Sequence, residues 1–181
     1  YVQAKKLFSE CLLLRENIHG KEHPDYAFSL NCLADTYSQL GDYAQELELR
    51  LNSLPLHEKI YGKEHEGYVN TLNSLAGTYE DLGEYNRALD LGLECLVIRE
   101  KTLGTQHPDY AQSLNNVATV YMRIGEYAKA LELQLECIGI IGEVFSIEHP
   151  NYALVLSNLS STYGLLGDYD QALKLNLESL D

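Results

Sequence analysis

Apolar residues recur at three- and four-residue steps along this chain, which is the spacing of one face of an α-helix. The first clear stripe lies within residues 30–40, and the same stripe returns 42 residues later and twice more after that. Each stripe therefore predicts one amphipathic helix. The four stripes are Leu30, Leu33, Ala34, Tyr37 and Leu40; Leu72, Leu75, Ala76, Tyr79 and Leu82; Leu114, Val117, Ala118, Tyr121 and Ile124; and Leu156, Leu159, Ser160, Tyr163 and Leu166.

A glycine follows each stripe, and an acidic residue follows the glycine. Glycine suits the left-handed residue that ends a helix, and an acid suits the first turn of the next one. A second helix is expected after each pair, so every repeat is predicted to be a helical hairpin. The pairs are Gly41-Asp42, Gly83-Glu84, Gly125-Glu126 and Gly167-Asp168.

The period of 42 residues also governs the aromatic residues, because all of the 14 tyrosines except Tyr61 fall in three columns of the repeat. Self-similarity at such a period predicts a solenoid of stacked units. We expect one array, 1–181, and interpret the sequence as a piece of a longer array. Its predicted parts are a second helix and loop of a preceding repeat (1–22), three repeats (23–64, 65–106, 107–148) and a truncated repeat (149–181).

Prolines mark two different places in the predicted hairpins. Pro24, Pro108 and Pro150 stand at the head of first helices, where the missing backbone donor costs nothing. Pro55 lies late in a second helix. There it is expected to remove a hydrogen bond and to kink or end that helix near residues 51–54.

With these small-residue, tyrosine and glycine positions, the chain resembles the tetratricopeptide repeat family over essentially its whole length. The usual repeat of that family has about 34 residues. The longer repeat here, with its His-Pro-Asp-Tyr-Ala opening at 107–111, looks most like the repeats of kinesin light chains and of large multidomain signalling proteins. The resemblance implies an all-α fold, a right-handed α-solenoid of antiparallel hairpins. Glu46 departs from the family pattern, which has a small residue there.

The net charge of −14 comes from 13 basic and 27 acidic side chains. Nucleic acids and anionic membranes require a basic surface, so neither is an expected partner. No apolar run is long enough to span a bilayer, and no export signal opens the sequence. We expect a cytoplasmic, reducing location. Acids on the second helices, among them Glu46, Glu48 and Glu94, are interpreted as a solvated convex face, with an acidic docking patch for a basic partner as the alternative.

Cysteine and histidine follow the repeat and not the spacing of a metal or redox site. Cys11, Cys95 and Cys137 share one column and are expected to be small buried residues. Equivalent helices of neighbouring hairpins lie on the order of 10 Å apart, too far for a disulfide or a shared metal. The histidines at the helix starts are instead predicted to accept backbone hydrogen bonds as caps: His23, His65, His107 and His149.

No catalytic or cofactor motif stands out in the sequence, so we expect no enzyme activity, no cofactor and no metal. The resemblance implies that the first helices line a concave groove that binds a peptide segment or a partner domain. Phe28, Leu154, Met122 and Leu165 are expected to supply apolar contacts there. The predicted groove residues are Phe28, Asn31, Asp35, Asn70, Asn73, Ser74, Gln112, Asn115, Asn116, Thr119, Arg123 and Asn158.

Asn31, Asn73 and Asn115 form a ladder of amides that either binds a peptide backbone or fixes neighbouring helices to one another. Arg123 is the only basic residue among the groove positions. The preference for acidic cargo associated with kinesin light chains is therefore not expected, and a neutral, apolar or mildly basic segment is favoured. The alternative function is a structural spacer, an oligomerising array that associates through its helix ends, or a regulatory arm of a larger protein.

Overall fold

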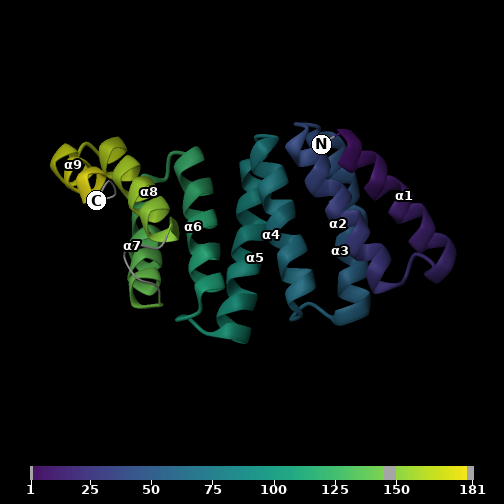
Figure 1. Ribbon diagram of the computed structural model, residues 1–181. Helices are drawn as coiled ribbons and strands as arrows, with labels where there is room; N and C mark the ends of the chain where they lie inside the picture. Colours follow the sequence, from purple (N-terminus) through teal and green to yellow (C-terminus); the bar gives the residue numbers. More distant parts are fainter. Residues whose placement is uncertain (1, 145–149, 179–181) are drawn as a thin grey trace. The chain divides into compact units, whose positions relative to one another are not determined.

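The structure, a computed structural model, describes residues 2–144 and 150–178, and its regular elements in that part are all α-helices. The all-α class is therefore confirmed. No helix among the described residues is both long and apolar enough to cross a bilayer. The helices are labelled in Figure 1: α1 (Val2–His19), α2 (Pro24–Gln39), α3 (Tyr43–Tyr61), α4 (Glu66–Asp81), α5 (Tyr85–Leu103), α6 (Pro108–Arg123), α7 (Tyr127–Val144), α8 (Pro150–Leu166) and α9 (Tyr169–Glu178).

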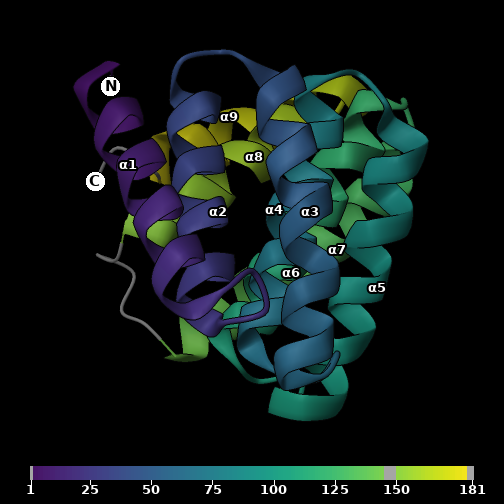
Figure 2. The ribbon, with the colours of Figure 1, turned by 90° about the vertical axis from the view of Figure 1, so that its right-hand side faces the viewer.

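The chain divides into two compact units, Tyr1–Leu91 and Gly92–Asp181, and α5 runs from one into the other. In the first unit α1 packs against α2, α2 against α3, and α3 against α4, as Figure 2 shows. The predicted stripe forms the interior, because Leu30, Leu33 and Ala34 of α2 are buried together with their equivalents in α4. Helical periodicity alone thus predicted which face is covered.

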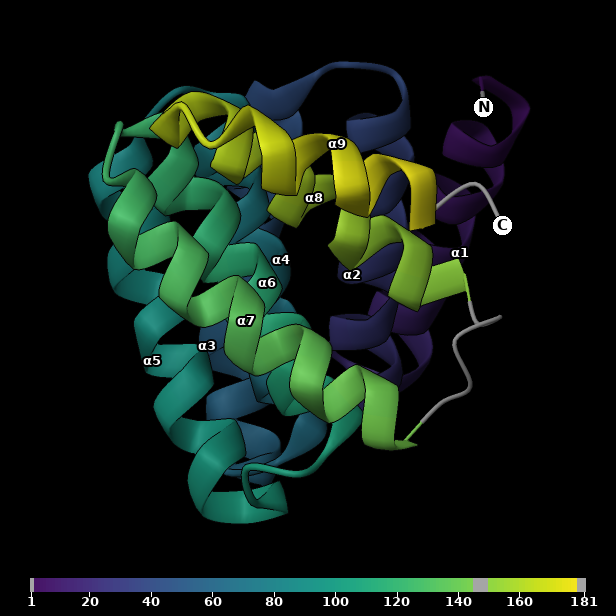
Figure 3. The same cartoon turned by 90° about the vertical axis from the view of Figure 1, so that its left-hand side faces the viewer.

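In the second unit α6, α7, α8 and α9 pack in succession, and α6 also contacts α8 (Figure 3). One apolar cluster joins Tyr110 and Leu114 of α6, Ile140 and Ile141 of α7, and Val155 of α8. Each unit therefore stacks helix hairpins whose apolar stripes form its own interior, which agrees with the confirmed solenoid of helix hairpins.

Histidine caps begin three of the first helices, as predicted. The Nδ1 atom of His23 accepts from the backbone nitrogen of Asp25 at 3.2 Å, and His65 and His107 make the same bond two residues on, at 3.0 and 3.1 Å. Each bond satisfies a backbone donor that the helix itself leaves unpaired. His149 lies outside the described residues.

Glycine ends the first helices as predicted, with φ of 72° at Gly41 and 75° at Gly83. The following acid also begins the next helix, since Asp42 Oδ1 accepts from the backbone nitrogen of Gln45 at 3.3 Å. The last residue of the stripe was predicted wrongly, because Leu40 is 40% exposed and Leu82 is 38% exposed. Both are C-cap residues, beyond the last full turn that packs against a neighbour.

Pro55 does not end α3, which continues to Tyr61, so of the two predicted outcomes the ending of the helix was wrong. Pro55 is exposed, whereas Ser53 and His57 on either side of it are buried. Because proline has no backbone N–H, the carbonyl one turn before Pro55 receives no helical hydrogen bond, and on this exposed side it can bind water instead. Packing of the buried face holds the helix together.

Two residues assigned from their repeat columns lie elsewhere than predicted. Glu46 belongs to the interior, being 2% exposed, and not to a solvated face. Cys11 is exposed, while its column partners Cys95 and Cys137 are buried. Cys137 Sγ contacts the Ala111 carbonyl of the first helix in its own hairpin, and among the described helices none precedes α1 to cover Cys11 in the same way.

Candidate functional site

The predicted groove residues lie on the first helices of both units. Five are exposed, and seven are half-buried between neighbouring helices. The exposed ones are the better placed for contact with a partner. The exposed residues are Phe28, Asp35, Asn70, Gln112 and Arg123; the half-buried ones are Asn31, Asn73, Ser74, Asn115, Asn116, Thr119 and Asn158.

In the first unit, the amide of Asn31 links two successive first helices. Its Nδ2 atom donates to Thr71 Oγ1 of α4 at 2.8 Å, and the threonine hydroxyl donates in turn to the Gly67 carbonyl at 2.8 Å. Among the described residues, Asn31 Oδ1 is buried and has no hydrogen-bond partner. This rung of the predicted ladder therefore joins α2 to α4.

The second unit contains a similar amide link. Asn158 Nδ2 of α8 donates to Asn115 Oδ1 of α6 at 3.0 Å, and Thr119 Oγ1 donates to the Asn115 carbonyl at 2.9 Å. Asn115 is thus held by a neighbour on the next first helix. Gln112, one turn earlier on α6, is exposed beside it. On this surface, the amides of Asn115 and Asn158 therefore link two helices, while the amide of Gln112 is accessible.

A buried cation reaches the groove side of the first unit, and the sequence did not single it out. Arg50 of α3 is 5% exposed, and its Nη2 atom donates to Asp35 Oδ1 at 2.8 Å. Its Nε atom donates to Glu46 Oε1 at 2.9 Å. The sequence did contain a signal for this ion pair. Glu46 and Arg50 are four residues apart on one helix, and the equivalent positions of other repeats carry small or neutral residues.

Each unit contains a pocket next to predicted groove residues. The pocket of the first unit has a volume of about 260 Å³ and lies between α1 and α2, with Phe8, Cys32, Asp35 and Gln39 in its wall. Phe28 also belongs to α2 and is 60% exposed. The guanidinium of Arg15, on α1, lies 5.8 Å from the centre of the Phe28 ring. Phe8, Cys32 and Gln39 were not among the predicted site residues.

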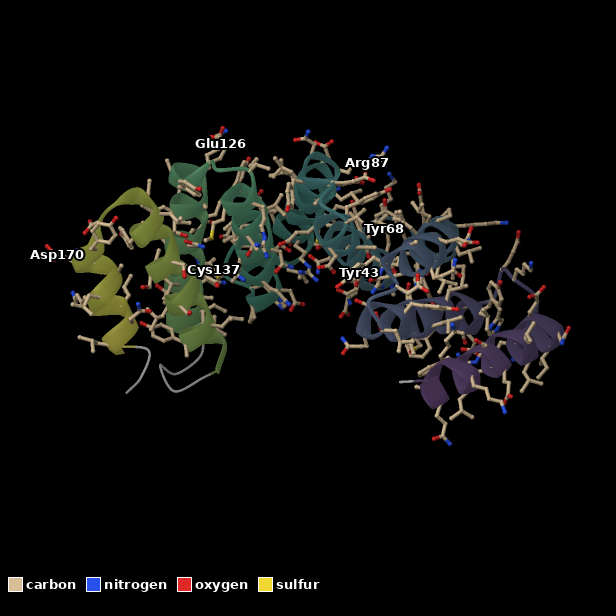
Figure 4. The ribbon with its side chains drawn as sticks, turned by 90° about the horizontal axis from the view of Figure 1, so that it is seen from above. Tyr43, Tyr68, Arg87, Glu126, Cys137 and Asp170 are labelled. Atoms are coloured by element: carbon tan, nitrogen blue, oxygen red, sulfur yellow. The ribbon has the colours of Figure 1, made fainter. Side chains whose placement is uncertain are left out.

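The pocket of the second unit has a volume of about 240 Å³ and lies between α6, α7 and α8. Gln112, Asn115 and Asn116 of the predicted groove line it, together with Leu154. Its inner wall includes Cys137, which Figure 4 labels among the side chains within the helices of this unit, whereas Glu126 lies at the outer edge. Cys137 and Ile141 were not among the predicted groove residues, which were taken from the first helices alone.

The cysteines next to these pockets are weak acids. Burial raises the pKa of the Cys137 thiol to about 12, and burial with the nearby Asp35 carboxylate raises the pKa of Cys32. A raised pKa keeps the thiol neutral near pH 7, and the thiolate is the nucleophile and metal ligand. The pocket of the first unit therefore offers a mainly apolar surface, and that of the second unit offers apolar and polar contacts; neither offers a reactive sulfur.

Comparison with known proteins agrees with this architecture. A family model described as the tetratricopeptide repeat matches residues 1–49 and 109–181, and a second model of the same description matches residues 69–109. The chain belongs to the tetratricopeptide repeat family. No curated protein sequence matches it significantly.

Solved structures with tetratricopeptide-like repeats resemble the chain over nearly its whole length. A variant of a Podosopora anserina protein with nearly identical repeats, assigned to the kinesin light chains, is 25% identical, covers 98% of this chain and 84% of its own, and has a TM-score of 0.85. BtubC (BKLC) from P. vanneervenii is 18% identical, with coverages of 98% and 70% and a TM-score of 0.87. The second likeness concerns the fold alone. The kinesin light chain-like repeat type inferred from the sequence is thus confirmed.

Proposed function

We propose that this tetratricopeptide repeat protein binds an extended segment of a protein partner on the exposed faces of its first helices, without catalysis. The observation that carries the proposal is the presence, in each unit, of a pocket bordered by first-helix residues. Folds of this family typically mediate protein–protein interactions. An extended segment can place side chains in pockets while amides contact its backbone.

The charge distribution supports a partner that is not strongly acidic. The chain as a whole carries a net charge of −14, which favours encounter with neutral or basic segments. In the first unit, the buried Arg50 is already paired with Asp35 and Glu46, so it does not offer a vacant site to a carboxylate. Kinesin light chain-like neighbours share the fold, and acidic ligands do not follow from that likeness.

A selection from a random 12-residue peptide library, followed by affinity measurements on variants, tests this function. The double variant Phe28→Ser with Leu154→Ser removes one exposed apolar side chain from the first-helix face of each unit. Its matched control, Leu51→Ser with Leu135→Ser, removes exposed leucines from second helices. The selected peptides should bind the wild type and the control alike, and the first-helix variant at least about fivefold more weakly. Equal binding to both double variants would exclude the first-helix surface.

Self-association is a second candidate, and one observation favours it. Leu13, Leu14 and Ile18 on α1 are 60%, 59% and 69% exposed, so this helix presents apolar area that a second copy could cover. Analytical ultracentrifugation of the wild type and of Leu14→Lys with Ile18→Lys tests it. A concentration-dependent dimer that the double variant abolishes would support assembly through α1, and a wild-type monomer at tens of micromolar would reject it.

A further inference from the structure

The pocket of the second unit has the size and lining of a site for one apolar side chain. Ile141 and Val155 in its wall are 3% and 4% exposed, and Leu154 is 56% exposed at its edge. Its volume of about 240 Å³ exceeds the roughly 150 Å³ of an apolar protein cavity that accommodates benzene. A leucine, isoleucine, methionine or phenylalanine side chain therefore fits.

Amide side chains belong to the lining of this pocket, Gln112 among them. Asn115 and Asn116 belong to its lining, and Asn115 is oriented by the hydrogen bond from Asn158 at 3.0 Å. An amide offers a donor and an acceptor, which are the groups that an extended peptide backbone requires on either side of an inserted side chain. The combination of an apolar wall and adjacent amides favours a peptide over a free apolar molecule.

Asp109 is the only charged residue among the described residues that line the pocket. Its side chain is 41% exposed, and its Oδ2 atom lies 3.8 Å from His107 Nδ1. The nearby Arg99 is buried and donates to the Asp109 backbone carbonyl and to Ser113 Oγ, both at 2.9 Å. Arg99 thus binds the backbone of Asp109 and not its carboxylate, which is partly exposed and can be reached by a ligand cation.

The pocket of the first unit is the less suitable of the two for a cationic partner. Its single charged lining residue, Asp35, already binds Arg50 at 2.8 Å. A ligand cation would compete there with a guanidinium that is also held by Glu46. Asp35 is thus already paired with an arginine, whereas the Asp109 carboxylate is not. For this reason we assign a basic ligand residue to the pocket of the second unit.

We propose that the pocket between α6, α7 and α8 anchors one apolar side chain of an extended peptide in which the adjacent residue is lysine or arginine, paired with Asp109. The proposal rests on the peptide-binding function proposed above and specifies its ligand. The apolar residue contacts Ile141, Leu154 and Val155, and the amides of Asn115 and Asn116 contact the backbone. The net charge of −14 attracts such a segment at long range.

Three fluorescein-labelled nonapeptides provide the test, with Lys-Leu-Lys, Glu-Leu-Glu or Lys-Ala-Lys at the centre of an otherwise Gly-Ser sequence. Fluorescence anisotropy measures binding, and methyl NMR locates it. The Lys-Leu-Lys peptide should bind at least about tenfold more tightly than either of the others and shift the methyl signals of Ile141, Leu154 and Val155. Equal or tighter binding of Glu-Leu-Glu would overturn the charge assignment, and equal binding of Lys-Ala-Lys would overturn the apolar anchor.

Variants separate the two parts of the proposed contact. Leu154→Ala should weaken the Lys-Leu-Lys peptide at least about fivefold, whereas the control Leu135→Ala, an exposed leucine of α7, should leave it unchanged. Asp109→Asn should remove most of the preference for lysine over glutamate. Loss of affinity equal in both leucine variants, or a preference for lysine over glutamate as large in Asp109→Asn as in the wild type, contradicts the proposed site.

The two proposals fail in different ways. If library-selected peptides require the first-helix residues but none of the three nonapeptides binds this pocket, the anchor proposal is wrong and the peptide-binding function stands. If the selected peptides bind independently of the first-helix residues, both proposals are wrong. Circular dichroism of every variant, compared with the wild type, shows whether the protein remains folded.

Discussion

Glu46 Oε1 accepts a hydrogen bond from Arg50 Nε at 2.9 Å, one turn further along α3, and both side chains are buried. The same carboxylate oxygen accepts from Thr78 Oγ1 of α4 at 2.9 Å. The equivalent residues in another repeat are Ala130 and Gln134. One repeat thus contains a buried ion pair where another contains neutral residues. The pair links α3 to both neighbouring first helices, because Arg50 also binds Asp35 of α2 and Glu46 binds Thr78 of α4.

Removal of Arg50 should be more harmful than removal of the whole pair. Arg50→Met leaves the Glu46 carboxylate buried without its cation, which typically costs about 3–5 kcal/mol of unfolding free energy. The double variant Glu46→Ala with Arg50→Gln reproduces the residues of another repeat and should recover much of that loss. Urea unfolding followed by circular dichroism measures both. A double variant at least as unstable as Arg50→Met would show that the ion pair itself stabilises the fold.

The sequence predicted the helices, their order and their buried faces because helical periodicity and the repeat act together over every unit. It also predicted the histidine caps, because the residue before a helix accepts a hydrogen bond from a backbone nitrogen only two or three residues further on, and this contact depends on local sequence alone. It failed at Glu46, Leu40 and Cys11, where burial depends on a residue's particular neighbours and not on its repeat column. It also missed the glycines that end second helices, such as Gly62 with φ of 82°.

The candidate site was harder to predict than the fold. First-helix positions such as Gln112 and Asn115 follow from the repeat, and they do line a pocket. Cys137 and Ile141 come from a second helix and reach the same pocket through packing, which no periodic pattern reveals. Sequence alone likewise did not indicate whether Asn31 was accessible or bonded to Thr71.

His57 should make the fold less stable in mild acid. Burial lowers the pKa of this histidine from its usual 6.5, outweighing the hydrogen bond to the Ser53 carbonyl, and the nearby His65 also lowers it. Below pH 6.5 the unfolded chain binds a proton that the folded chain resists, so the stability present above that pH is lost as the pH falls toward the lowered pKa of the folded state.

The variant His57→Arg tests this acid sensitivity, because arginine occupies the same column at Arg15 and Arg99. Urea unfolding at pH 7.5 and pH 5.5 should show a smaller loss of stability for the variant than for the wild type. His65→Asn serves as a comparison for the neighbouring histidine. If the wild type and His57→Arg lose the same free energy between the two pH values, His57 does not govern the acid response.

The cap at the start of α6 should contribute measurably to stability. His107→Ala leaves the backbone nitrogen of Asp109 without its acceptor and should cost about 1 kcal/mol, whereas His107→Asn supplies another acceptor and should cost less. Urea unfolding of the two variants at pH 7.5 distinguishes them. Identical losses would indicate that packing of the ring, and not its hydrogen bond, is what matters at this position.

The four thiols should react in the order of their exposure. Cys11 is exposed and Cys32 half-buried, while Cys95 and Cys137 are buried, and burial raises the pKa of both buried thiols. A thiol-reactive dye at pH 8 should therefore modify Cys11 first and Cys32 more slowly, and should reach the other two only in denaturant. Mass spectrometry of tryptic peptides measures each site. Early labelling of Cys137 would show that α7 opens readily from its neighbours.

The amide link between Asn158 and Asn115 should stabilise the second unit independently of ligand binding. Asn158→Ala leaves Asn115 Oδ1 without its donor, and loss of one such hydrogen bond typically costs about 1 kcal/mol. The double variant Asn158→Leu with Asn115→Leu removes both partners of the hydrogen bond. It should cost less unfolding free energy per amide removed than Asn158→Ala does. Gln112→Ala changes an exposed amide nearby and should leave the unfolding midpoint in urea almost unchanged.

Asn158→Ala and a second double variant, Gln112→Ala with Asn115→Ala, also separate the two roles considered for the amides. If the Asn115 amide mainly fixes α8 to α6, Asn158→Ala lowers stability while peptides selected on the wild type retain their affinity at temperatures where the variant is folded. If it mainly contacts the ligand, Asn158→Ala frees the amide and leaves stability unchanged, and Gln112→Ala with Asn115→Ala then weakens binding. Since Asn115 Oδ1 already accepts a bond at 3.0 Å, we expect the first result, with peptide contact carried by the Asn115 amide nitrogen together with Asn116 and the exposed Gln112.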